Sequence, residues 1–292
     1  MNKQKNNYHN YKISVPEALL FFIITVISGQ FIGGIFSLPG MAYPGLADFF
    51  LPFSFFAGFG TAAFIIMLLK RLNFNDIKKF FHTHTKPKTI LLGIILYLVA
   101  LPIAEYLAML VPTTGNTILE ELYDFFEKSF AIIFEHKIAA FIMVCILAPI
   151  LEELIFRGLI LRGMLQHGIN PWFAIIFTSL LFGIAHMNPW QFFGAGLLGS
   201  VFGYIYWRTQ SLWLVIFLHA LNNTIAYVMT IYTQNLQETI FEPNFFVIAA
   251  SALLVLLIGW LLYQKTHNTT LHEAQTQENN KIYEFQSDDE IN

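Results

Sequence analysis

The sequence predicts an all-α, polytopic integral membrane protein with about eight transmembrane helices. Of its 292 residues, 56% are hydrophobic and only 12% are charged, which is about half the charged fraction of an ordinary soluble domain. Apolar stretches close to the roughly 20 residues that cross a hydrocarbon core recur along the chain. Within lipid only helices and closed barrels satisfy every backbone hydrogen bond, so these stretches are interpreted as helices.

The predicted spans divide the chain into three parts. They cover approximately residues 17–38, 47–69, 89–111, 138–161, 171–187, 191–207, 211–231 and 244–263. Residues 1–16 are expected to form a cytoplasmic N-terminal segment, residues 17–264 the helical membrane domain, and residues 265–292 a polar, disordered tail. The fifth and sixth spans are short and meet at Asn188-Pro189, which predicts a tight helical hairpin.

Charge in the loops predicts the orientation. Basic residues precede the first span and fill the loop between the second and third spans, which contains Lys70, Arg71, Lys78, Lys79, Lys86 and Lys88. The loop after the third span is acidic. Because Lys and Arg remain on the cytoplasmic side, both termini are expected in the cytoplasm. The composition of the sequence is typical of a bacterial protein, so the plasma membrane of a bacterium is the expected location. The net charge of −3 leaves no basic face for nucleic acid.

Ionisable side chains are few inside the predicted spans, where burial costs several kcal/mol unless the group is paired or hydrated. Of the nine histidines, only His186 and His219 fall within spans. The fourth span contains Glu152 and Glu153, and Asn223 follows His219 by four residues on the same helix face. These positions lie at similar depths, so we expect the side chains to converge.

The two glutamates are expected to have different roles. Glu153 and Arg157 are four residues apart with the acid first, which favours a structural ion pair. Glu152 points about 100° away and remains available as a general base. Together with one histidine it can hold and deprotonate a water molecule, while the other histidine and Asn223 can donate hydrogen bonds to an oxyanion. The cluster therefore predicts hydrolysis.

Two other function classes remain open. A non-enzymatic membrane scaffold or immunity factor would use the same cluster as a structural element. A proton-coupled transporter would relay protons through Glu105, Glu152 and the histidines. The chain contains no internal repeat of spans, which weighs against the transporter.

Three ordered motifs resemble those of the CAAX prenyl protease and bacteriocin-processing (CPBP) family: Glu152-Glu153-x-x-x-Arg157, Phe182-x-x-x-His186 and His219-x-x-x-Asn223. The resemblance covers roughly residues 140–230. It implies an intramembrane endopeptidase with an eight-helix core, acting on a peptide or membrane-protein substrate that need not be prenylated.

The same resemblance implies roles for the motif residues. Glu152 is then the water-activating base and His186 assists it, while His219 and Asn223 lie on the oxyanion side. Glu153 and Arg157 would then hold the first motif in its shape. No cofactor is expected, because His219 can act as a donor with Asn223 without a metal. The motifs also lack His-Glu-x-x-His. A zinc enzyme stays open as an alternative, with Glu152, His186 and His219 as its ligands.

Overall fold

The computed structural model describes residues 11–81, 85–233 and 244–266, and every regular element within them is a helix. The predicted all-α membrane fold is therefore confirmed. Six helical segments of this part are long and apolar enough to cross a membrane: Val15–Ala42, Pro44–Leu69, Pro87–Met109, Lys137–Gln166, Leu212–Thr233 and Phe245–Thr266.

The predicted count of eight spans is not confirmed, because two of the eight predicted segments are not among these six. The predicted fifth span corresponds to α10 (Pro171–Ala185), an apolar helix shorter than the six. The sixth corresponds to α11 (Pro189–Thr209), whose apolar residues are interrupted by polar ones and glycines. These two helices pack closely against each other, as the predicted hairpin requires. A Cβ atom at Gly183 in α10 would lie only 2.8 Å from the carbonyl oxygen of Phe192 in α11.

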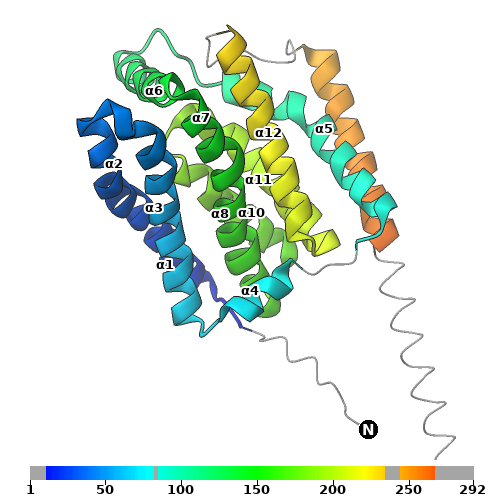
Figure 1. Cartoon of the computed structure of the whole chain (residues 1–292). Coiled ribbons are helices and arrows are strands. Elements are labelled where there is room, and N and C mark those ends of the chain that lie inside the picture. Colours follow the sequence, from blue (N-terminus) through cyan, green and yellow to red (C-terminus); the bar gives the residue numbers. More distant parts are fainter. Residues whose placement is uncertain (1–10, 82–84, 234–243, 267–292) are drawn as a thin grey trace, which may run out of the picture.

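The helices form one bundle (Figure 1). On one side α1 (Val15–Ile27) and α2 (Gly33–Ala42), joined by a π-helical turn, run antiparallel to α3 (Ala47–Leu69). On the other side lie α5 (Pro87–Met109) and the last helix, Phe245–Thr266. The elements from α7 to α12 (Leu212–Thr233) occupy the space between these two sides.

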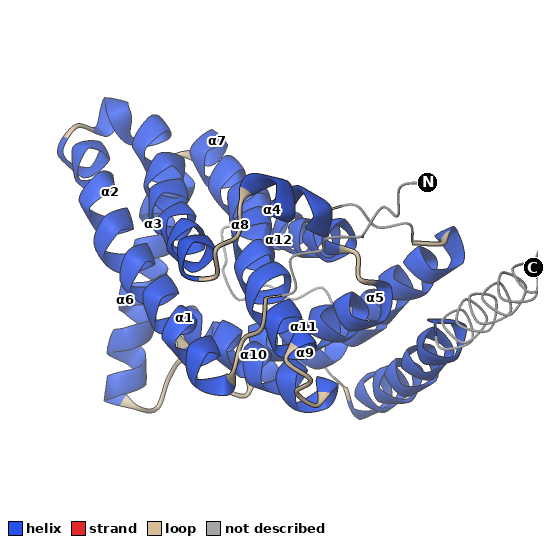
Figure 2. Cartoon of the chain, turned by 90° about the horizontal axis from the view of Figure 1, so that it is seen from below, coloured by secondary structure: helices blue, strands red, loops and turns tan. Residues whose placement is uncertain are grey.

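The two ends of the bundle carry opposite charge. Helix α4 (Phe74–Phe80) lies at one end and α6 (Thr117–Glu135) at the other (Figure 1). The end with α4, here called the basic end, faces the viewer in Figure 2 and includes Lys12, Lys70, Arg71, Lys78, Lys79, Lys86, Lys88, Arg162, Arg208 and Lys265. The end with α6, here called the acidic end, includes Asp48, Glu120, Glu121, Asp124, Glu127 and Glu135. Both Val15 and Thr266 lie at the basic end, as an even number of crossings requires.

The segment before α1 is docked on the fourth span. Ile13 donates its backbone N–H to the carbonyl of Gly163 at 3.0 Å. The Tyr11 hydroxyl lies 2.7 Å from the Gly158 carbonyl and 2.8 Å from the Leu159 carbonyl. A side chain at Gly163 would collide with Ile13, because a Cβ atom there would lie 2.5 Å from it. The predicted N-terminal segment thus contributes buried packing and does more than precede the membrane domain.

Replacing Tyr11 by Phe is expected to lower thermal stability, because two buried carbonyls lose their donor. Burial raises the pKa of the Tyr11 hydroxyl well above its ordinary value, so the wild-type group stays protonated and donates. An unsatisfied buried acceptor costs about 1–3 kcal/mol, measurable by thermal unfolding in detergent. Tyr43→Phe is the control, since Tyr43 is 67% exposed at the acidic end. Equal losses in both variants would contradict the docking role of Tyr11.

Candidate active site

The fourth span changes its helical winding around Pro149. A π-helical segment, η3 (Phe141–Leu147), precedes α8 (Ala148–Glu153), and a second one, η4 (Leu154–Leu161), follows it. In η3 the N–H of Ala148 reaches back five residues to the Met143 carbonyl. The next such bond would run from residue 149 to Val144, but proline has no N–H. The Val144 carbonyl instead accepts a hydrogen bond from Nδ2 of Asn223 in α12 at 2.9 Å.

Glu153 of α8 is linked to α11 and α12 by hydrogen bonds, through Arg157 to the first and directly to the second. Its side chain is completely buried, and its Oε1 atom accepts a hydrogen bond from Nη1 of Arg157 at 2.8 Å. The predicted ion pair is therefore present. The second arm of the guanidinium donates to the carbonyl of Gly199 in α11 at 2.9 Å. The same Glu153 oxygen also lies 2.9 Å from Nδ1 of His219 in α12, a contact that the sequence did not predict.

Glu152 has a different environment from its neighbour. Its side chain keeps 13% of its surface exposed, and no ion pair joins it to Arg157. Its Oε2 atom lies 3.9 Å from Nε2 of His219. Because Nδ1 of that ring faces Glu153, Nε2 is the atom turned toward Glu152. The two glutamates thus contact the two nitrogens of one imidazole.

His186 is placed by the end of α10. Its Nδ1 atom lies 2.9 Å from the Phe182 carbonyl, which can only accept, so Nδ1 donates. A neutral His186 therefore presents Nε2 as an acceptor. It lies close enough to Glu152 for their charges to interact, without a direct hydrogen bond between them.

The Phe182 ring separates the polar groups of the site. It meets the rings of His186 and His219 edge to face, with centroids 4.9 and 5.8 Å away. The guanidinium of Arg157 lies 4.5 Å from its centre, a cation–π distance. The sequence identified this residue only as part of a motif; its spacing four residues before His186 was the signal for a contact.

Gly199→Ala is expected to lower both stability and any activity of the site. A Cβ atom at Gly199 would lie 3.1 Å from Nη2 of Arg157 and 3.2 Å from the Phe182 ring, and overpacking costs about 1–3 kcal/mol. Thermal unfolding in detergent measures the loss. Gly196→Ala in the same helix is the control, since its Cβ would meet only Ser179 at 3.9 Å. A similar loss in Gly196→Ala would point to helix propensity instead.

Glu152, His186 and His219 are the candidate ligands of the zinc alternative. In the described part of the chain, no group of three or more His, Cys, Asp or Glu side chains is positioned to hold a metal ion. Nδ1 of His186 is engaged by a backbone carbonyl and Nδ1 of His219 by Glu153. These contacts leave Nε2 of each ring available, as in histidines that bind zinc through Nε2 while Nδ1 donates to a carbonyl or carboxylate.

Comparison with known proteins locates the site within a matched segment. Residues 134–225 match the family model described as "Type II CAAX prenyl endopeptidase Rce1-like", and they include every residue from Glu152 to Asn223 discussed above. This segment is Rce1-like. The expected resemblance to the CAAX protease family is confirmed for this segment.

A curated relative supports the same relationship. The chain is 38% identical over 84 residues to the "Putative membrane peptidase YdiL" of Bacillus subtilis (strain 168). The match covers 29% of this chain and 34% of that protein, so the chain spans about a third of the length of this relative. No solved structure matches the chain.

Proposed function

We propose that this protein is a membrane endopeptidase in which Glu152 activates the water that cleaves a peptide bond in or near the membrane. The observation that carries the proposal is the contact of one imidazole with both glutamates: Glu153 holds Nδ1 of His219, and Nε2 faces Glu152 at 3.9 Å. The Rce1-like segment supports the peptidase class. None of the contacts described above favours the scaffold or the transporter.

The proposed reaction begins at Glu152. Its carboxylate accepts a proton from a water molecule while the water oxygen forms a bond to the substrate carbonyl carbon. The same proton then passes to the amide nitrogen as the carbon–nitrogen bond breaks, so the products are a carboxylic acid and an amine. A partly exposed carboxylate that is not ion-paired with Arg157 suits this role, because its oxygens remain open to a water molecule.

His219 and Asn223 are proposed to stabilise the oxyanion. The separation of 3.9 Å between Glu152 and His219 is too long for a direct hydrogen bond, so each group can bind a different atom of the reacting pair. With a proton on each ring nitrogen, His219 can donate through Nδ1 to Glu153 and through Nε2 to the substrate oxygen. One N–H of Asn223 is engaged by Val144, and its second can donate as well.

His186 is proposed to assist the water. Because its Nδ1 donates to a backbone carbonyl, Nε2 of the neutral ring can accept the second hydrogen of the attacking water. Two acceptors then fix the direction of the water's lone pair. The expected result of His186→Ala is a slower reaction at unchanged thermal stability.

The mechanism is proposed to need no metal, and a chelator tests this directly. The detergent-purified protein is expected to cleave members of a peptide library equally well with and without a zinc chelator. Loss of cleavage with the chelator, reversed by added zinc, would overturn the metal-free mechanism and retain the peptidase. Absence of cleavage under every condition would count against the peptidase itself.

The orientation is part of the proposal. We infer that the basic end lies in the cytoplasm, because Lys and Arg are retained on that side. A fluorescent protein fused after residue 292 is then expected to fold and fluoresce in cells, and a periplasmic phosphatase at the same position is expected to stay inactive. The reverse pattern would invert the orientation.

A further inference from the structure

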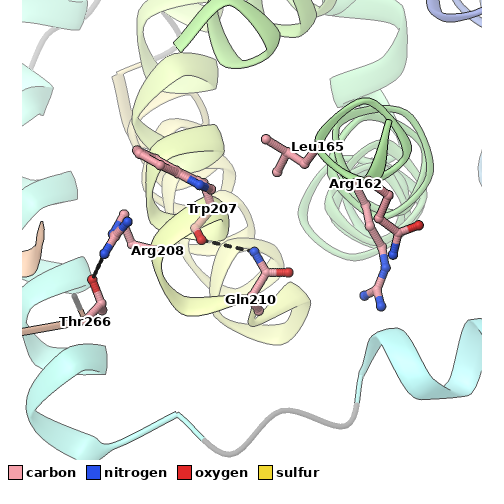
Figure 3. A pocket seen from close by; sticks show the side chains of 7 residues that line it. Arg162, Leu165, Trp207, Arg208, Gln210 and Thr266 are labelled. Carbon is pink, nitrogen blue, oxygen red and sulfur yellow. Dashed lines mark hydrogen bonds between the residues drawn. The ribbon is translucent and has the colours of Figure 1, made fainter. Parts of the chain in front are cut away.

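A separate polar cavity lies at the basic end, and none of the candidate active-site residues lines it. It has a volume of about 420 Å³ and is partly open. Its lining residues come from α9 (Arg162–Gln166), from the end of α11 and from the last helix: Arg162, Leu165, Gln166, Trp207, Arg208, Gln210 and Thr266 (Figure 3). The two arginines approach the cavity from different sides (Figure 3).

Within the described residues, no acid forms an ion pair with either of these arginines, Arg162 and Arg208. Two described carboxylates near this end pair with lysines instead, as Glu17–Lys70 and Asp76–Lys79. An arginine with no anionic partner beside a cavity is a ready-made anion-binding group.

Aromatic rings hold both guanidinium groups in place. Arg208 lies 4.7 Å from the centre of the Trp207 ring and 4.6 Å from that of Tyr263, and its Nε donates to Thr266 at 2.8 Å. Arg162 lies 4.4 Å from the centre of the Phe80 ring. Stacking occupies the faces of a guanidinium and leaves its edge for hydrogen bonds. In Arg208 Nη2 also donates to Thr266, so Nη1 is the arm that has no acceptor among the described residues and can bind a ligand.

Two buried polar atoms at the cavity also lack partners. Nε of Arg162 and Oε1 of Gln166 are buried without a hydrogen-bond partner among the described residues. A buried polar group left unpaired costs free energy. An anion can accept from the Arg162 Nε–H, whereas the Gln166 oxygen needs a donor such as a headgroup hydroxyl. Both side chains belong to α9, and Arg162 lies on a different side of the cavity from Arg208 (Figure 3).

The position of the cavity identifies its ligand. It lies where α9, α11 and the last helix end, and Trp207 is of the residue type that gathers at headgroup level. Basic pockets between transmembrane helices suit phospholipid headgroups, and guanidinium groups bind phosphate through two parallel hydrogen bonds. We propose that this cavity binds the phosphate headgroup of an anionic phospholipid, with Arg162 and Arg208 as the anion-binding groups. This proposal goes beyond peptide hydrolysis and does not depend on it.

Lipid binding here has a structural consequence. The last helix is attached to α11 through Arg208–Thr266 and through the Tyr204 hydroxyl, which donates to the Gly259 carbonyl at 2.7 Å. A headgroup bound at the same place joins α9 to this pair. Bound anionic lipid is therefore expected to raise the unfolding temperature of the whole protein.

The test uses the full-length protein in neutral detergent, titrated with phosphatidylglycerol or with zwitterionic phosphatidylcholine. Native mass spectrometry counts the bound lipids and thermal unfolding reports stabilisation. Phosphatidylglycerol is expected to bind and stabilise, and phosphatidylcholine is not. The double variant Arg162→Gln/Arg208→Gln should bind phosphatidylglycerol about 30-fold more weakly. Arg71→Gln, at the same end but outside the cavity, should bind like the wild type.

Three outcomes overturn the proposal. Equal binding of the two lipids would remove the role of charge, and equal weakening in Arg71→Gln would indicate a diffuse surface effect. Displacement of phosphatidylglycerol by millimolar inorganic phosphate would assign the cavity to a soluble anion. If the double variant does not fold, the single variant Arg162→Gln replaces it. It is expected to weaken binding about fivefold, and unchanged binding there would refute the site.

Discussion

Glu152→Gln is expected to lower peptide cleavage by about 10²- to 10⁴-fold, the range that general acid–base groups contribute. Glutamine keeps the size and polarity of the side chain but cannot accept the proton of the attacking water. Cleavage of a peptide library by the detergent-purified variant, compared with the wild type, measures the effect. Thermal stability should change little, because Glu152 is not paired with Arg157. Its distance of 3.9 Å from His219 is also too long for a hydrogen bond that the substitution could break.

The matched control for this variant is Glu121→Gln. Glu121 is an exposed residue of α6 at the acidic end, so this variant makes the same chemical change far from the site. The Glu121→Gln variant should cleave the library at the wild-type rate. Full activity of Glu152→Gln would sink the mechanism. Equal loss in both variants would point to a general effect of lost acidity.

Glu153→Gln is expected to have the largest effect on stability, about 3 kcal/mol or more, because removing one partner of a buried pair leaves the other charge uncompensated. Arg157 is only 1% exposed, so its charge has no access to water. Activity should fall as well, since Nδ1 of His219 loses its anionic partner. Denaturant or thermal unfolding in detergent measures the first effect, and cleavage below the unfolding temperature measures the second.

A second substitution separates the ion pair from the rest of the site. Arg157→Met removes the charge that Glu153→Gln leaves unpaired, so the double variant should recover part of the lost stability. It should not recover activity, because His219 still lacks its carboxylate. If the two losses simply add, the pair is not coupled and the proposed role of Glu153 is wrong.

The sequence predicted the fold class because composition alone imposes it. A chain with 12% charged residues can bury its apolar helices only in lipid or in one another. The number of spans does not follow from composition in the same way. Helix α10 is short, and α11 carries glycines and polar residues that face neighbouring helices. In such a helix, packing decides whether it lies inside the bundle, and local hydropathy does not record packing.

The motif spacings predicted which polar residues matter, but not how they are connected. Glu153 and Arg157 are neighbours on one helix, so their contact follows from helical geometry. The contact of Glu153 with His219 joins residues 66 positions apart, and it depends on how α12 lies against α8. The hydrogen-bond partner of Asn223 could not be predicted from the spacing either. It is the backbone carbonyl of Val144, which lacks its helical donor because residue 149 is a proline.

The contacts of Glu153 also determine when the proposed enzyme can become active during synthesis. Its carboxylate is inserted early, in the fourth span, whereas His219 and Asn223 belong to α12, which leaves the ribosome more than 50 residues later. A nascent chain that has not yet inserted α12 has a glutamate but no oxyanion donors. Proteolysis in the membrane would therefore begin only after most of the bundle has assembled, without a separate inhibitory segment.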